Sequence, residues 1–203
     1  MILVRRKISF VPRRPGWVVL RAAMGMVAMV LSFWAFGMLP LGDATLIQNA
    51  QPTIVALFSL WFLREPAGKL NILSICVGFL GLVLILQPSM SLGGLAGFAM
   101  LASAALSAGV GVTLRRLSVD DEPWVIVFAF MVLTAIAMFP AAVATGTLPA
   151  LNDIPLLLLL GGSATLGQIA MTEAYAMERA PLVAAAGYSS VLFALCWGFL
   201  FWD

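Results

Sequence analysis

The sequence contains no histidine. Without histidine the chain cannot form a Ser-His or Cys-His nucleophilic pair, and it lacks the commonest ligand of transition metals. It also has no phosphate-binding loop, which argues against ATP as a driving force within the chain. The two cysteines, Cys76 and Cys196, lie in apolar runs, where a thiol usually behaves as a small hydrophobic group. We therefore expect no cofactor, no metal site and no disulfide.

Charged residues are also scarce. They make up 10% of the 203 residues, whereas 63% are hydrophobic, and the mean hydropathy is +1.08. Such a chain has too little polar surface to cover a soluble globule. The net charge of +2 comes from short basic clusters, which gives nucleic-acid binding no support. The apolar runs reach spanning length without the alternation of a lipid-facing barrel, so we predict an all-α, polytopic transmembrane helical bundle.

Seven spans are expected, joined by short connections that contain proline, glycine or acidic residues. They are Trp17–Leu39, Ala44–Leu63, Leu70–Leu86, Leu92–Leu114, Trp124–Val143, Ile154–Met177 and Pro181–Trp202.

The distribution of basic residues predicts the orientation in the membrane. When the connections are assigned alternately to the two sides, all 11 lysine and arginine residues fall on one side, if Arg21 near the start of the first span is included. Such residues are retained on the cytoplasmic side. We expect a bacterial inner-membrane protein with its N-terminal basic segment, residues 1–15, in the cytoplasm and Asp203 outside.

The chain contains a weak internal repeat with an offset of 139 residues. Residues 35–38 match residues 174–177, and residues 43–64 overlie residues 182–203. One repeat period holds five spans, and a unit with an odd number of spans is inserted upside down relative to its copy. Inverted repeats are typical of secondary transporters, whose substrate site lies near the midplane between the halves.

One segment resembles a known family. It runs Leu39-Pro40-Leu41-Gly42-Asp43-Ala44-Thr45-Leu46-Ile47-Gln48-Asn49-Ala50-Gln51-Pro52, and is followed by Leu63-Arg64-Glu65-Pro66 and a helix with Gly78 and Gly81. This order resembles the EamA-type transporters of the drug/metabolite transporter superfamily.

The resemblance implies a ten-helix fold of two five-helix inverted repeats. Residues 1–91 would form part of the first repeat and residues 92–203 part of the second. The chain would then hold spans three to nine, so that the resemblance also implies a fragment or a truncated product.

Polar residues are densest in the second predicted span, where Gln48, Asn49 and Gln51 precede Pro52. Polar groups in hydrocarbon normally face a bundle interior or a watery cavity. Pro52 removes a backbone donor and frees a carbonyl one turn back. A helix loosened there could bind a polar metabolite, although hydrogen bonds that merely hold the bundle explain these side chains equally well.

The repeat equivalents of this stretch are Gly187, Tyr188, Ser189 and Ser190 in the seventh span. Under the family fold both stretches face the pseudo-symmetric centre. Tyr188 could stack on a substrate and donate a hydrogen bond, or it could serve packing alone. Trp34 is a further candidate for the cavity wall, with packing as the alternative.

Glu173 is the one acid placed well inside a predicted span. It could bind a proton or a cationic substrate group, because burial raises the pKa of a carboxyl group. Glu178 and Arg179 are near enough in sequence to satisfy it instead.

Glu65 lies at a cytoplasmic helix end, where the helix dipole disfavours an acid. We expect it to pair with Arg64, Lys69 or a neighbouring loop, in a gating or structural role. The acidic loop of residues 120–122 is expected to be a solvated turn. Ser103, Ser107 and Gly111 recur every four residues and permit close helix contact, in a homodimer or within one chain.

These features favour a secondary transporter that moves a small polar or amphipathic metabolite across the lipid bilayer by alternating access, as an exporter that could use the proton gradient. An enzyme is not expected, because histidine is absent and Pro40-Leu41-Gly42-Asp43 departs from the Gly-x-Gly-Asp pattern of aspartyl intramembrane proteases. A non-transporting membrane fragment or an assembly or regulatory subunit remains the alternative.

Overall fold

The computed structural model describes residues 12–65, 68–86, 94–146 and 150–202. Every regular element in these ranges is helical, which confirms the predicted helical bundle. The elements are α2 (Pro15–Phe36), α3 (Leu41–Gln48), α4 (Gln51–Phe58), the π-helical turn η1 (Ser59–Leu63), α5 (Lys69–Leu86), α6 (Gly94–Leu117), α7 (Pro123–Thr145), the 3-10 turn η2 (Leu151–Asp153), α8 (Ile154–Met177), α9 (Ala180–Ala186) and α10 (Ser189–Trp202).

The helices form the seven segments that the sequence predicts. Five stretches are long and apolar enough to cross a membrane, and two shorter apolar helices cover Lys69–Gly81 and Ala180–Phe193. The chain is therefore a multi-pass membrane protein. Residues 1–11, with Arg5, Arg6 and Lys7 of the expected cytoplasmic cluster, lie outside the described residues, as does Asp203.

The second and seventh predicted spans are each broken in the middle. The second divides into α3 and α4 at Asn49 and Ala50, and the seventh divides into α9 and α10 at Gly187 and Tyr188. Pro52 stands in the first turn of α4, where a proline is tolerated because its missing N–H has no helical partner there. The loosening expected at Pro52 is thus a true interruption.

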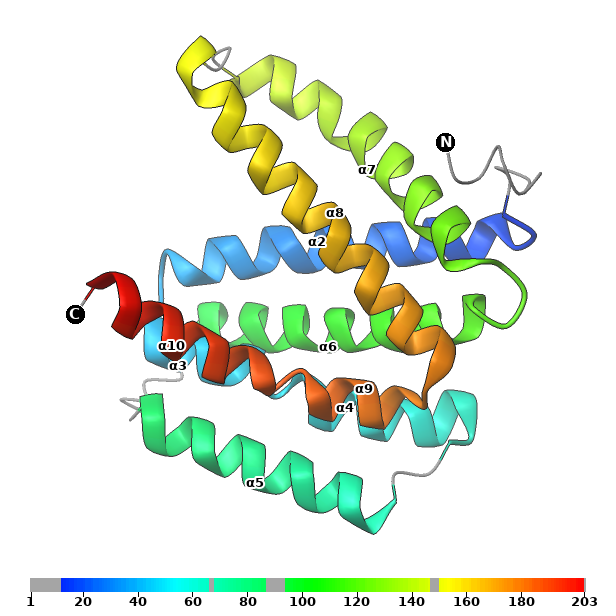
Figure 1. Cartoon of the computed structure of the whole chain (residues 1–203), viewed down its shortest axis with the longest axis vertical. Coiled ribbons are helices and arrows are strands. Elements are labelled where there is room, and N and C mark those ends of the chain that lie inside the picture. Colours follow the sequence, from blue (N-terminus) through cyan, green and yellow to red (C-terminus); the bar gives the residue numbers. More distant parts are fainter. Residues whose placement is uncertain (1–11, 66–67, 87–93, 147–149, 203) are drawn as a thin grey trace. The chain divides into compact units, whose positions relative to one another are not determined.

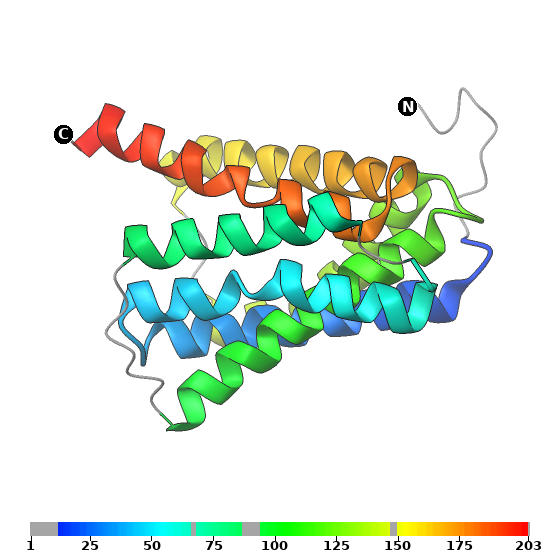
Figure 2. The same ribbon diagram turned by 90° about the horizontal axis from the view of Figure 1, so that it is seen from below.

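The chain divides into two compact units. The first unit holds residues 1–22 and 114–177, and in it α7 and α8 form a helical hairpin (Figure 1). The second unit holds residues 23–113 and 178–203, with both broken segments. Within it α4 packs against α9, and α5 lies beside both broken segments (Figure 2).

Small residues form much of the core of the second unit. Ala35 and Ala44 are fully buried and lie in one cluster with Met100 of α6. The Ser103 hydroxyl donates a 2.7 Å hydrogen bond to the Ala28 carbonyl, which ties α6 to α2. At this position, the small-residue pattern therefore serves a helix crossing within one chain, whereas a homodimer stays a prediction.

In the first unit the acidic loop, expected to be a solvated turn, is solvated only in part, because Glu122 is exposed whereas Asp120 and Asp121 contact other residues. The Arg14 Nε lies 2.8 Å from a carboxylate oxygen of Asp120. The backbone N–H of Arg13 donates a 2.8 Å hydrogen bond to Asp121, which is largely buried. Arg13 and Arg14, just before α2, therefore supply partners for two of the three acids of this loop.

Candidate functional site

The break between α3 and α4 leaves backbone groups outside the regular helical ladder. Pro52 has no N–H to give to the Gln48 carbonyl one turn earlier. After the break, the N–H groups of Thr53 and Ile54 both donate to the Ala50 carbonyl, at 3.1 and 3.2 Å. The Asn49 carbonyl is consequently available to a partner from another helix.

That partner is Tyr188, at the break of the other segment. Its hydroxyl donates a 2.9 Å hydrogen bond to the Asn49 carbonyl, and the Thr53 side chain is a further hydrogen-bond partner of Tyr188. Asn49 and Tyr188 are 139 residues apart, which is the offset of the sequence repeat. The two breaks are thus joined through residues that are equivalent in the repeat.

The aromatic ring of Tyr188 lies directly on α5. A side-chain carbon added to Gly78 would come within 2.7 Å of Cδ2 and 2.9 Å of Cγ of the ring. Carbon atoms in good contact are about 3.5–4.0 Å apart, so only glycine leaves room for this ring. Gly81, one turn further along α5, has no such neighbour within 4 Å. Gly78 therefore sets how closely Tyr188 approaches the break.

The two broken segments run antiparallel. Asn49 contacts Tyr188 at the breaks. Glu65, just after η1, contacts the beginning of α9, where the Ala180 N–H donates a 3.4 Å hydrogen bond to the Glu65 carboxylate. A carboxylate at a helix N-terminus is favoured by the helix dipole and by the free N–H groups there. The sequence predicted Arg64, Lys69 or a neighbouring loop as partners of Glu65, and the start of α9 is one partner that the structure shows.

Helix boundaries follow the same offset. Pro15 and Ile154, where α2 and α8 begin, are 139 residues apart, as are Leu41 and Ala180, where α3 and α9 begin. These matching starts support the internal repeat independently of its few identical residues.

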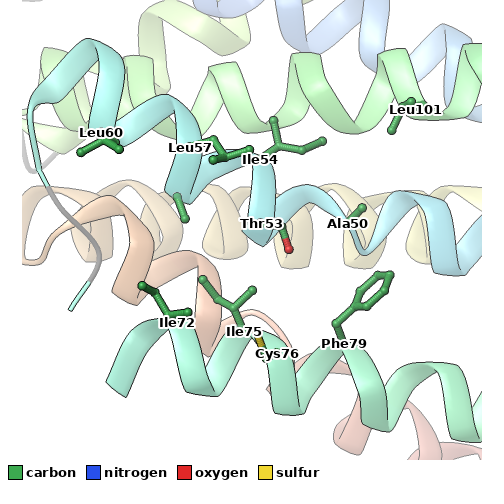
Figure 3. A pocket seen from close by; sticks show the side chains of 11 residues that line it. Ala50, Thr53, Ile54, Leu57, Leu60, Ile72, Ile75, Cys76, Phe79 and Leu101 are labelled. Carbon is green, nitrogen blue, oxygen red and sulfur yellow. The ribbon is translucent and has the colours of Figure 1, made fainter. Parts of the chain in front are cut away.

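Two cavities adjoin the paired breaks in the second unit. The larger has a volume of about 660 Å³ and is mainly apolar. It lies between α4 and α5, where Thr53 points toward α5 while Ile75 and Phe79 point back (Figure 3). The smaller, of about 330 Å³, is lined by Gly78, Gly81, Tyr188 and Ser189 among others. Together they place apolar volume beside a few polar groups, as in small-molecule sites.

The polar residues expected in the second span cluster at the break, and their side chains differ in how many hydrogen bonds they make. The Asn49 side-chain amide donates to the Thr45 carbonyl at 2.8 Å. The Gln48 side-chain oxygen is buried and has no hydrogen-bond partner within the described ranges. Gln51 is half-buried beside the buried Pro52. Gln48 thus carries a buried side-chain oxygen that could accept a hydrogen bond from a ligand.

The remaining predicted residues are less central. Ser189 and Ser190 are exposed; Ser189 lines the smaller cavity, whereas the Ser190 hydroxyl donates locally to the Gly187 carbonyl. Trp34 of α2 is 42% exposed and lines neither of these cavities. Glu173 lies on an exposed face of α8, in the first unit. Trp34 therefore lies away from the two cavities at the breaks, and the role of Glu173 stays a prediction.

Three residues of interest were not selected from the sequence as site residues. Thr53 follows the proline and presents its hydroxyl to the larger cavity. Gly78 was recognised only as part of a family motif. Arg21 was counted among the loop charges, yet it is buried inside α2 with 1% exposure. An ionisable residue six positions inside a span is itself a signal of function. This signal was missed because Arg21 was assigned to the loops when the basic residues were counted.

Broken helices that meet near their midpoints, with free backbone groups and polar side chains there, are a feature of secondary transporters. Residues 1–87 match the model of the EamA-like transporter family. The pseudopaline exporter CntI of Pseudomonas aeruginosa is 33% identical over 205 residues, which cover 99% of this chain and 72% of the exporter. The chain belongs to the EamA-like transporter family, within the drug/metabolite transporter superfamily.

More distant relatives are transporters as well. Human solute carrier family 35 member G1 is 26% identical over 99% of this chain and 60% of its own length. The riboflavin transporter of Vibrio cholerae is 26% identical over 83% of this chain and 57% of its own length. No solved structure matches the chain. Family and relatives identify a membrane transporter rather than an enzyme.

Proposed function

We propose that this chain carries the central part of an alternating-access transporter that exports a small polar or amphipathic metabolite. The observation that carries the proposal is the hydrogen bond between Tyr188 and the Asn49 carbonyl, which joins two helix breaks at repeat-equivalent positions. Gln48, Asn49, Gln51 and Tyr188 would contact polar groups of the substrate. Ser189 and Ser190 would border the same region.

The two cavities fit an amphipathic substrate. The larger one, about 660 Å³, is lined almost entirely by apolar side chains and reaches the break at Ala50 and Thr53. Its volume lies in the range of small-molecule sites. We assign this space to the apolar part of the metabolite, with its polar part at the break.

Alternating access would use the inverted repeat, with residues 1–91 in the first copy and residues 92–203 in the second. Matching helix starts and the antiparallel broken segments support this arrangement. A motion that separates Tyr188 from Asn49 would open the site, while contact between Glu65 and the start of α9 would act as a gate toward the cytoplasm.

Loop contacts support a cytoplasmic N-terminus in the inner membrane. In the first unit, Arg14 meets Asp120, and Arg115 donates to the carbonyls of Tyr175 and Ala176 at 3.3 and 3.1 Å. The basic residues just before α2 and at the end of α6 therefore lie at one end of that unit, together with the C-terminal end of α8. Lysine and arginine gathered at one end favour the cytoplasmic side.

Transport can be measured in everted inner-membrane vesicles that contain the protein. Riboflavin is a suitable fluorescent probe because a relative is named for it, and mass spectrometry of vesicles exposed to a metabolite extract covers other substrates. Export in the cell corresponds to uptake by everted vesicles. A proton ionophore tests coupling, and Glu173→Gln tests Glu173 as the proton carrier, since it removes the titratable group.

The chain offers a matched pair of variants, because Tyr175 and Tyr188 are its only tyrosines. Tyr188→Phe removes the hydroxyl that bridges the breaks and should reduce uptake several-fold, since the Asn49 carbonyl loses its partner. Tyr175→Phe removes the same group from α8 and should change uptake little. Absence of uptake above that of vesicles without the protein would instead favour an assembly or regulatory subunit.

A further inference from the structure

Arg21 is a buried cation, and none of its identified contacts is with an acidic side chain. It lies six residues after the start of α2, about 9 Å along the helix axis, within a stretch apolar enough to span a membrane. Its side chain is 1% exposed. Long basic side chains near helix ends normally extend to the aqueous interface, so complete burial at this depth requires an explanation.

The guanidinium has two identified contacts, and both are with uncharged groups of the same unit. Nη2 donates a 2.8 Å hydrogen bond to the side-chain oxygen of Gln168 on α8. The central carbon of the guanidinium lies 3.9 Å from the centroid of the Phe130 ring on α7. Nε and Nη1 are buried and have no hydrogen-bond partner within the described part of the chain.

The identified contacts of the two buried or half-buried acids in this unit are with other residues. Asp120 pairs with Arg14, and Oδ1 of Asp121 accepts the backbone N–H of Arg13, while the buried Oδ2 of Asp121 has no hydrogen-bond partner among the described residues. An arginine side chain stays protonated and carries five N–H donors, so a neutral amide and an aromatic face satisfy it only in part. Buried charges are ordinarily paired, because desolvation without a counter-ion is strongly unfavourable.

We propose that Arg21 recognises a negatively charged oxygen group, such as a carboxylate, on the metabolite that this transporter carries. Nε and Nη1 would donate to the anion while Gln168 and Phe130 hold the guanidinium in place. The bound anion would supply the charge and the hydrogen-bond acceptors that the described residues do not. This assigns an anionic substrate class and rests on the transport function proposed above.

An anion can reach Arg21 only if the helices around it separate. The two identified contacts of Arg21, Gln168 on α8 and Phe130 on α7, belong to its own unit, in which α7 and α8 form a hairpin. Alternating access provides such a motion, since one group of helices rocks against another. The contacts of Arg21 with Gln168 and Phe130 describe the closed state of this position.

Binding can be tested without transport, by thermal unfolding of the purified full chain in neutral detergent at constant ionic strength. Three carboxylates are each compared with the uncharged amide of the same shape: nicotinate with nicotinamide, succinate with succinamide, and benzoate with benzamide. Ligands that bind the folded state raise Tm, and titration gives an apparent Kd. At least one carboxylate should bind the wild type about tenfold more tightly than its amide.

Arg21→Met removes the charge and keeps an apolar side chain of comparable length, so it should abolish this preference. Arg116→Gln is the matched control, because Arg116 is exposed at the end of α6, and it should retain the preference. Arg21→Lys keeps the charge with fewer donors and should prefer the carboxylate more weakly, which provides a second variant if Arg21→Met does not fold.

Several outcomes would overturn the proposal. The first is that the wild type binds every carboxylate and its amide equally well. The second is that Arg21→Met still prefers a carboxylate over its amide. The third is that added phosphatidylglycerol stabilises the wild type while no carboxylate does, which would assign the anion to lipid. Because these measurements require binding alone, a failure of transport in vesicles leaves their interpretation intact.

Discussion

The close contact between the Tyr188 ring and Gly78 predicts different effects of alanine substitutions at two glycines of α5. Gly78→Ala and Gly81→Ala introduce the same methyl group one turn apart on α5. At Gly78 the new carbon would lie 2.7 Å from the Tyr188 ring, whereas at Gly81 nothing lies within 4 Å. The ring would have to move away from α5, and its hydroxyl, 2.9 Å from the Asn49 carbonyl, would move with it.

The expected magnitudes follow from three opposing contributions. Replacing glycine by alanine in a helix interior favours folding by about 0.5–1 kcal/mol at either site. Overpacking at Gly78 costs about 1–3 kcal/mol, and loss of an interhelical hydrogen bond within a membrane protein costs about 0.6 kcal/mol more. Gly81→Ala should therefore be neutral or slightly stabilising, while Gly78→Ala should be less stable than Gly81→Ala by about 1–4 kcal/mol.

Both variants can be compared with the wild type by equilibrium unfolding in mixed micelles with increasing denaturing detergent. A second test uses Tyr188→Phe. If Gly78→Ala acts by displacing Tyr188, it should weaken transport as Tyr188→Phe does, and the double variant should lose less than the sum of the two single losses. Equal stability of the two glycine variants, within about 0.5 kcal/mol, would refute the steric argument.

Three further changes probe the helix contacts. Pro52→Ala restores a backbone donor at the start of α4 and should slow transport without loss of stability, whereas Pro140→Ala within α7 should leave uptake unchanged; vesicle uptake measures both. Glu65→Gln keeps an acceptor for the Ala180 N–H but removes the charge at the start of α9, so unfolding in micelles should show a loss of about 0.3–1 kcal/mol. Ser103→Ala removes the hydrogen bond between α6 and α2 and should cost about 0.6 kcal/mol by the same assay.

The helices could be predicted from sequence because composition determines them almost alone. Every predicted span from Trp17 to Trp202 corresponds to a helical segment, and the sixth agrees with α8 at both ends. Long apolar runs interrupted by proline, glycine and charge leave few alternatives in a membrane. Pro52 also indicated the break in the second span, because a proline removes a backbone hydrogen-bond donor at any position.

Side-chain partners could not be predicted in the same way. The break at Gly187 and Tyr188 has no proline, and glycine in an apolar run is equally compatible with an unbroken helix. Glu65 was expected to pair with a basic residue or a loop, and its contact with the Ala180 N–H could not be foreseen because it depends on where α9 begins. Arg21 was counted as a loop charge because it lies near a predicted span end, and its contacts with Gln168 and Phe130 depend on how distant helices pack.

The internal repeat links the helices, which could be predicted, to one side-chain contact, which could not. Its sequence match was weak, yet Asn49 and Tyr188, which the offset of 139 residues makes equivalent, are the pair that meets in the structure. In an antiparallel pair related by a two-fold axis, equivalent residues approach each other only close to that axis. Under the proposed inverted repeat, the contact would place the pseudo-symmetry axis of the second unit at the two breaks. Substitutions at Asn49, Gly78 and Tyr188 should then affect transport more than equally disruptive substitutions at the ends of the same helices.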